Sequence, residues 1–101
     1  MELPVVEKTI VINNPQGMHM RPAEMFAQLA QSFESEIKVI RDSLCVDAKS
    51  IMHVLTLGAS QGTVLTLQAH GVDAVEALEA IAHLVERDFE TDETLSQGSS
   101  S

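Results

Sequence analysis

The sequence predicts an α+β domain of two layers, with helices covering one face of a β-sheet. Three observations support this fold class: four short segments are rich in β-branched or alternating residues, three segments have helical spacing, and turn-forming residues separate them. The predicted order is therefore β-α-β-β-α-β-α, in which the helices bury the apolar face of the sheet. At 101 residues, the chain is long enough for one domain with a modest core.

The first predicted strand and helix are separated by a turn. The strand covers 5–12 and is rich in β-branched residues, and the segment 13–17 that follows combines Asn, Pro and Gly. A helix is expected over 21–33, because Pro22 suits the first turn and apolar residues then recur on one side. That apolar side comprises Met25, Phe26, Leu29, Ala30 and Phe33.

A hairpin and a short helix are expected next. Polar and apolar residues alternate over 36–41, and a second strand over 44–48 follows after only two turn residues. The segment 51–57 has apolar residues at helical spacing. Ser50 precedes this segment and is expected to be its N-cap, because a serine hydroxyl accepts a hydrogen bond from a free backbone N–H.

The last predicted elements are a strand over 64–69 and a long amphipathic helix. Asp73 and Glu76 have the spacing of a capping box, in which two side chains bond reciprocally to the start of a helix. The apolar pattern stops near residue 89, so the predicted domain covers 1–89 and residues 90–101 form an acidic, Ser-rich mobile tail. The expected buried face of the long helix comprises Val75, Leu78, Ile81, Ala82, Val85 and Phe89.

A histidine stands immediately before the first predicted helix. At this position, His19 is next to free backbone N–H groups and the positive end of the helix dipole, which together favour an anion such as phosphate. Arg21 adds a permanent charge that can bind two phosphate oxygens at once. Because neutral imidazole is nucleophilic near neutral pH, the pattern predicts a histidine that carries a phosphoryl group.

Composition and charge narrow the classes of function. The net charge is −9, whereas nucleic-acid binding depends on clustered Lys and Arg, so no nucleic-acid partner is expected. Positive potential is expected only locally, around Arg21 and Lys49. We expect a cytoplasmic protein without membrane insertion, because the sequence has neither a signal-peptide pattern nor an apolar stretch of spanning length.

The remaining reactive side chains are expected to be structural or exposed. Cys45 is the single cysteine, so no internal disulfide can form, and it is expected to pack as a small apolar residue. His53, His70 and His83 are expected on the surface without a catalytic role. No metal site and no cofactor are predicted.

Three separated segments form a combined signature: 17–23 (GMHMRPA), 49–52 (KSIM) and 57–63 (LGASQGT). Together they resemble the histidine-containing phosphocarrier family HPr of the bacterial phosphotransferase system, and the resemblance covers about residues 5–89. It implies an open-faced β-sandwich with a four-stranded antiparallel sheet and three helices. It also implies a carrier, without independent enzymatic turnover, that receives a phosphoryl group from Enzyme I, charged by phosphoenolpyruvate, and passes it to Enzyme IIA.

The resemblance also implies roles for individual residues. His19 would be phosphorylated, with Nδ1 as the expected atom, and Arg21 would stabilise the phosphoryl group. Ser50 matches the serine that HPr kinase/phosphorylase modifies in some bacteria. The protein is expected to be a monomer. The residues expected to bind partner enzymes are Met18, Met20, Lys49, Ile51, Met52 and Leu55, of which Met52 and Leu55 are expected to be the more exposed.

Departures from the family pattern leave the partner open. Met20 stands where the family usually has Ala, and Ala48 and His53 stand where it commonly has Gly. One alternative is a regulatory binding module, controlled by phosphorylation of Ser50 and without a role in sugar transport. A second alternative is a structural domain whose helix end only binds anions. Phosphorylation of His19 in a Ser50→Ala variant would favour the carrier over the regulatory module.

Overall fold

The computed structural model describes residues 3–90, which form one sheet and three helices in the predicted order. The strands are β1 (Val5–Val11), β2 (Glu36–Arg41), β3 (Leu44–Asp47) and β4 (Val64–His70). The helices are α1 (Met20–Gln31), α2 (Ile51–Thr56) and α3 (Ala74–Glu86). The predicted tail lies outside the described residues, apart from Glu90.

All strand pairs in the sheet are antiparallel, and the strand order is β1-β4-β2-β3. The last strand in the sequence therefore lies between β1 and β2, with His70 paired to Val5 on one side and to Glu36 on the other. β2 and β3 form the predicted hairpin. These pairings confirm both the fold class and the four-stranded antiparallel sheet that the resemblance implied.

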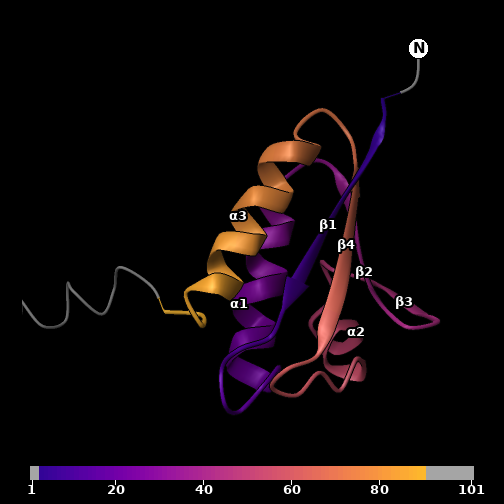
Figure 1. Cartoon of the computed structure of the whole chain (residues 1–101). Helices are drawn as coiled ribbons and strands as arrows, with labels where there is room; N and C mark the ends of the chain where they lie inside the picture. Colours follow the sequence, from indigo (N-terminus) through magenta and orange to yellow (C-terminus); the bar gives the residue numbers. More distant parts are fainter. Residues whose placement is uncertain (1–2, 91–101) are drawn as a thin grey trace, which may run out of the picture.

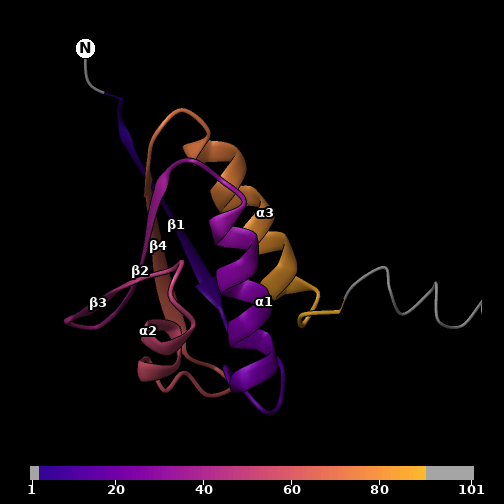
Figure 2. The ribbon, with the colours of Figure 1, turned by 180° about the vertical axis from the view of Figure 1, so that it is seen from behind.

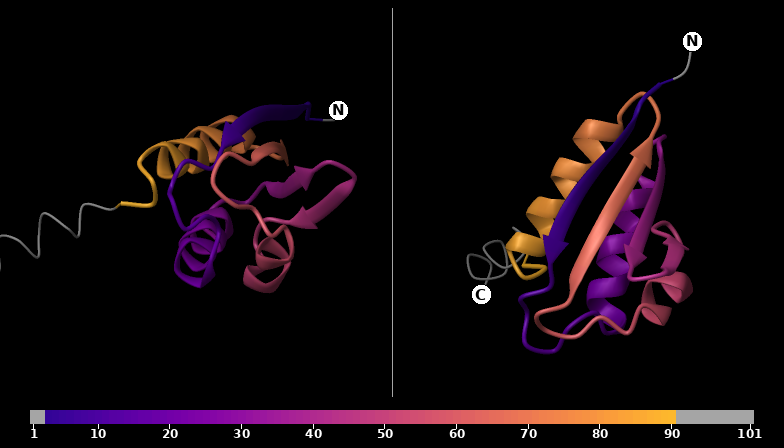
Figure 3. Two further views of the ribbon diagram at one scale, coloured as in Figure 1. Left: turned by 60° about the horizontal axis from the view of Figure 1, so that its bottom comes forward. Right: turned by 45° about the vertical axis from the view of Figure 1, so that its right-hand side comes forward.

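Helices cover only one face of this sheet. Figure 1 and Figure 2 show, from opposite sides, that α1 and α3 lie next to each other, and α2 lies near the end where α1 begins. In the right-hand view of Figure 3, the strands lie in front of the helices, so the other face of the sheet has no helix over it in the described chain. The arrangement is the predicted open-faced sandwich.

The core lies between the sheet and the two longer helices. Phe26 of α1 and Ile81 of α3 are fully buried, as are the inward residues Leu65 and Leu67 of β4. Burial of one such side chain contributes about 1.5–3 kcal/mol. The predicted apolar face of α3 is confirmed except at Val75, which is 53% exposed because it lies on the solvent side of the first helical turn.

Two further expectations, for Cys45 and Asp73, were wrong. In both cases, the environment of the side chain depends on residues that are distant in the sequence. Cys45 is exposed, because it lies on the edge strand β3 with its side chain opposite to that of the buried Val46. Asp73 is the N-cap residue of α3 but makes no capping hydrogen bond with its side chain, so the expected capping box does not form.

The carboxylate of Asp73 instead binds the segment that joins α1 to β2. It accepts hydrogen bonds from the backbone N–H groups of Glu34 and Ser35, both at 2.9 Å, and from the hydroxyl of Ser35 at 2.5 Å. These bonds, that from the Ser35 hydroxyl most of all, hold the pKa of the Asp73 carboxyl below its usual value of 3.8. Asp73 therefore links the connection between β4 and α3 to the connection between α1 and β2.

Candidate functional site

His19 is the N-cap residue of α1, so the helix begins one residue earlier than predicted, at Met20. Its backbone is extended, with φ −87° and ψ −168°, and its carbonyl accepts the hydrogen bond of Ala23 N–H at 2.9 Å. The imidazole makes no capping hydrogen bond and is exposed. The ring nitrogens therefore remain available for reaction at the end of the helix.

The start of α1 presents two unpaired backbone donors. Within the described residues, the N–H groups of Met20 and Arg21 have no hydrogen-bond partner, whereas that of Ala23 is used by His19. Pro22, between them, has no N–H. The positive end of the helix dipole adds to these donors, so an anion held beside His19 would meet both unpaired groups.

The loop before His19 is held in one conformation by Gly17 and its neighbours. Gly17 has a φ of +71°, and a Cβ atom there would lie 2.6 Å from the carbonyl oxygen of Ala59. Met18 N–H donates to that same oxygen at 2.8 Å. The side-chain amide of Asn14, only 7% exposed, donates to the Gly17 carbonyl at 2.7 Å. The turn at Asn14 and the segment at Ala59 therefore both hold the loop that leads to His19.

A pocket of 360 Å³ opens beside His19, and residues from 14–25 and from 88–89 line it together. Asp88 and Phe89, which follow α3, line the pocket together with residues of α1 and of the turn before it. Figure 3 shows that the end of α3 is close to the start of α1. Sequence reasoning missed Asn14 and Asp88 as site residues. An Asn before a glycine turn was the available signal for Asn14. The lining comprises Asn14, Pro15, Gln16, His19, Arg21, Pro22, Met25, Asp88 and Phe89.

Ser50 is confirmed as the N-cap residue of α2, because its hydroxyl accepts the hydrogen bond of His53 N–H at 3.3 Å. Lys49 lies away from His19. Its ammonium group donates to the carbonyl of Phe33 at 2.8 Å, just beyond the C-terminal end of α1, whereas His19 is at the other end of this helix. The positive charge near His19 therefore comes from Arg21 and the helix end.

The apolar residues expected at a docking surface differ in exposure. Met52 is 67% exposed, as expected, and Met20 is 52% exposed. Ile51 and Leu55 are both half-buried, so the expectation that Leu55 is one of the more exposed residues was wrong. Met18 is only 5% exposed because it packs into the core, so the expectation that it contributes to the surface was wrong. His53, His70 and His83 are exposed, as predicted.

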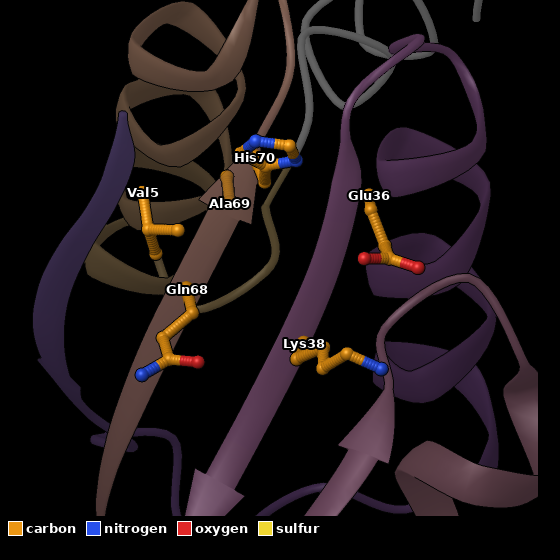
Figure 4. Close-up of a pocket in the computed structure, with 6 residues that line it drawn as sticks. All are labelled: Val5, Glu36, Lys38, Gln68, Ala69 and His70. Atoms are coloured by element: carbon orange, nitrogen blue, oxygen red, sulfur yellow. The ribbon is translucent and has the colours of Figure 1, made fainter. Parts of the chain in front are cut away.

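A second pocket, of 280 Å³, lies at the opposite end of the sheet. Figure 4 shows that His70 and Gln68 come from β4, whereas Glu36 and Lys38 come from the neighbouring strand β2. Both pockets are lined by one carboxylate, one permanent cation and one histidine, but every residue that lines this second pocket lies in a strand, so it lacks the helix start that adjoins His19. Its lining comprises Val5, Glu36, Lys38, Gln68, Ala69 and His70.

Two further observations apply to the described residues as a whole. Within 3–90, no group of three or more His, Cys, Asp or Glu side chains is placed to hold a metal ion. No helix in this part of the chain has the length and apolar character needed to cross a membrane.

An exposed histidine at the start of a helix with unpaired N–H groups, on an open-faced sandwich of this order, points to the class of histidine phosphocarriers. The family model described as the phosphorylation site of the HPr component of the phosphotransferase system matches residues 6–87. The chain therefore belongs to the HPr phosphocarrier family of that system.

Individual relatives agree over nearly their whole length. The phosphocarrier protein HPr of Treponema pallidum is 43% identical over 86 residues, which cover 85% of this chain and 98% of the relative. A crystal structure of HPr from Thermoanaerobacter tengcongensis has a TM-score of 0.81 and 48% identity, covering 83% of this chain and 94% of that one. The HPr-like protein Crh of Halalkalibacterium halodurans is 38% identical over 84 residues, covering 83% of this chain and all of the relative.

Proposed function

We propose that this protein accepts a phosphoryl group on His19 from phosphorylated Enzyme I, itself charged by phosphoenolpyruvate, and passes it to an Enzyme IIA acceptor. The carrier would work as a cytoplasmic monomer in sugar transport or in a regulatory branch. The observation that carries the proposal is the exposed imidazole of His19 beside the unpaired N–H groups of Met20 and Arg21.

The transfer requires little from the protein beyond position and charge. The lone pair of His19 Nδ1 attacks phosphorus, the bond between phosphorus and the donor atom of Enzyme I breaks, and the electron pair leaves with that donor. The unpaired N–H groups and the Arg21 guanidinium then stabilise the negative phosphoryl oxygens. Because the phosphoryl group remains beside an exposed surface, the next acceptor can reach it.

Partner enzymes would dock around the histidine on apolar side chains. Met20 and Met52 are the most exposed of these, and methionine side chains adapt to differently shaped surfaces. Such a surface suits a carrier that meets a donor and an acceptor in turn. Ile51 and Leu55 would contribute the exposed parts of their side chains, and Lys49 would act only at the margin of this surface.

Intact-mass analysis after incubation with phosphoenolpyruvate and a bacterial Enzyme I tests the proposal. We expect one acid-labile phosphoryl group on the unmodified chain and none on a His19→Ala variant. His83→Ala is the matched control, because it removes another exposed histidine on a helix, outside the proposed docking surface, and should leave phosphorylation unchanged. Phosphorylation that persists in His19→Ala, or that is lost in His83→Ala, would contradict the assignment.

Ser50 supports a second, regulatory function. Ser50 is half-buried and its hydroxyl caps α2, which carries the exposed Met52, so a phosphate there would add charge to the docking surface. Incubation with ATP and HPr kinase/phosphorylase, with Ser50→Ala as the control, tests this site. Modification of Ser50 in a chain that no Enzyme I phosphorylates would favour a regulatory module over a carrier.

A further inference from the structure

Asp88 brings a negative charge into the pocket that His19 and Arg21 share. Among the described residues that line this pocket, Asp88 is the one acidic residue and Arg21 is the one permanent cation. Arg87 precedes Asp88 in the chain but does not line the pocket. A carboxylate repels the phosphoryl group that the rest of this site attracts, so its presence calls for an explanation.

The backbone fixes Asp88 in a position that usually favours glycine. Asp88 N–H donates to Val85 carbonyl oxygen and Phe89 N–H donates to Leu84 carbonyl oxygen, both at 2.9 Å, which is the Schellman arrangement at the end of α3. Asp88 occupies the left-handed position of this motif, with a φ of +54°. Phe89 is only 7% exposed and anchors the turn in the core.

Two local effects disfavour an aspartate at this position. A left-handed backbone costs a residue other than glycine about 1 kcal/mol, although aspartate tolerates it better than most. The C-terminal end of a helix also carries partial negative charge, which disfavours a carboxylate there. Local structure alone therefore does not account for Asp88, and backbone outliers of this kind occur often at functional sites.

We propose that Asp88 sets the reactivity of the phosphoryl site: its carboxylate destabilises the phosphoryl group on His19 and so favours transfer onward. This inference rests on the proposed phosphocarrier function. The repulsion acts through the shared pocket, and it lowers the equilibrium population of the phosphorylated form. Arg21 and the helix end attract the group, so the balance between Arg21 and Asp88 determines how firmly it is held.

The test variant is Asp88→Asn, and Asp42→Asn is its matched control. Asp42 is also an exposed aspartate with a φ of +54°, but it lies in the turn between β2 and β3 and does not line the pocket. Both substitutions remove one negative charge at a left-handed position that asparagine tolerates. A difference between the two variants therefore reports the location of the charge.

The first measurement is the affinity for inorganic phosphate, followed through the NMR signals of the His19 ring. At low ionic strength, we expect Asp88→Asn to bind phosphate about 3- to 10-fold more tightly than the unmodified chain, whereas Asp42→Asn should match the unmodified chain. The difference should shrink at about 0.5 M salt because salt screens exposed charges. Equal affinities in the three proteins, or no phosphate response in any of them, would overturn the proposal.

The second measurement is the equilibrium ratio of phosphorylated to unphosphorylated protein with Enzyme I, phosphoenolpyruvate and pyruvate. Asp88→Asn should raise this ratio by a similar factor, and an unchanged or lower ratio would also overturn the proposal. If no Enzyme I phosphorylates His19 in the unmodified chain, the proposed function fails. The phosphate titration does not need Enzyme I, so the effect of Asp88 on the site is still decided by that first measurement.

Discussion

The side-chain amide of Asn14 donates a hydrogen bond of 2.7 Å to the backbone carbonyl of Gly17, two residues before His19. The same carbonyl accepts His19 N–H at 3.0 Å, so Asn14 and His19 share one acceptor. The amide oxygen of Asn14 is buried and has no partner among the described residues. Asn14 therefore contributes to the site as a donor, through the loop that orients His19.

Asn14→Asp should weaken both folding and phosphoryl acceptance. The substitution keeps the shape of the side chain but replaces the donor with a carboxylate oxygen that faces the Gly17 carbonyl. Loss of a buried hydrogen bond of this kind costs about 1–3 kcal/mol. Urea denaturation measures the free energy of unfolding. The effect on the site is measured as the rate of phosphorylation by Enzyme I, without urea and under conditions in which the variant is fully folded.

Asn13→Asp is the matched control for this substitution. Asn13 is the exposed neighbour, so its substitution adds the same charge next to the loop without removing the bond to Gly17. We expect it to leave both stability and phosphorylation close to those of the unmodified chain. Equal effects of the two variants would show that charge, and not the Asn14 hydrogen bond, controls the loop.

Gly17→Ala should destabilise the protein more than Gly62→Ala. Both glycines have positive φ values, +71° and +91°, so both substitutions impose backbone strain of about 1–2 kcal/mol. At Gly17, the new Cβ would also lie 2.6 Å from Ala59 oxygen, whereas at Gly62 nothing lies within 4 Å. In thermal denaturation, the melting temperature of Gly17→Ala should be clearly lower than that of Gly62→Ala. The reverse order would contradict the close packing of Gly17 against Ala59.

The Asp73 carboxylate should make stability depend on pH in the acid range. Hydrogen bonds from Ser35 and Glu34 lower its pKa in the folded state below the usual 3.8. Its contribution is therefore complete above the unfolded-state pKa and is lost as the pH falls through the lower folded-state pKa. Denaturation midpoints measured from neutral pH to about pH 2 should fall, and less steeply in Asp73→Asn.

Ser35→Ala gives an independent check on this contact. Ser35 is 1% exposed and its hydroxyl donates to Asp73, so the substitution should lower stability at neutral pH and make the acid decline shallower. Ser43→Ala, in the exposed turn between β2 and β3, should leave the profile unchanged. If the denaturation midpoint of Ser35→Ala fell with decreasing pH as steeply as that of the unmodified chain, this would argue against the Ser35–Asp73 bond.

Substitutions at Ser50 should separate helix capping from partner docking. Ser50→Ala removes the acceptor of the His53 N–H bond, which should cost about 1 kcal/mol while His19 still receives a phosphoryl group. Ser50→Asp adds charge beside the exposed Met52 and should raise the KM for phosphorylation by Enzyme I several-fold. Enzyme I kinetics and denaturation measure the two effects.

Ser43→Asp is the control for the added charge, because Ser43 is exposed in the turn between β2 and β3 and is not among the residues proposed to dock Enzyme I. It should leave the KM unchanged. An unchanged KM in Ser50→Asp as well would show that Enzyme I does not dock on the surface around α2.

Features that depend on near neighbours in the chain were predictable. Alternation identified the strand over Glu36–Arg41, and hydroxyl chemistry identified Ser50 as a cap. The place of His19 and Arg21 at the start of α1 was predictable for the same reason, because a helix end and the side chains beside it are defined within a few residues. These preferences act over one helical turn or one strand, so they can be recognised without knowing the fold.

Features that depend on distant neighbours were decided by the tertiary structure. Asp73 has the sequence pattern of a cap, yet its carboxylate binds Ser35, because a folded chain offers partners that local spacing does not reveal. Packing likewise buries Met18, next to the exposed His19. The sequence alone determined which residue is the candidate phosphoryl acceptor. The fold decided that Asp88 shares its pocket, because only packing of α3 beside α1 brings the end of one helix to the start of the other.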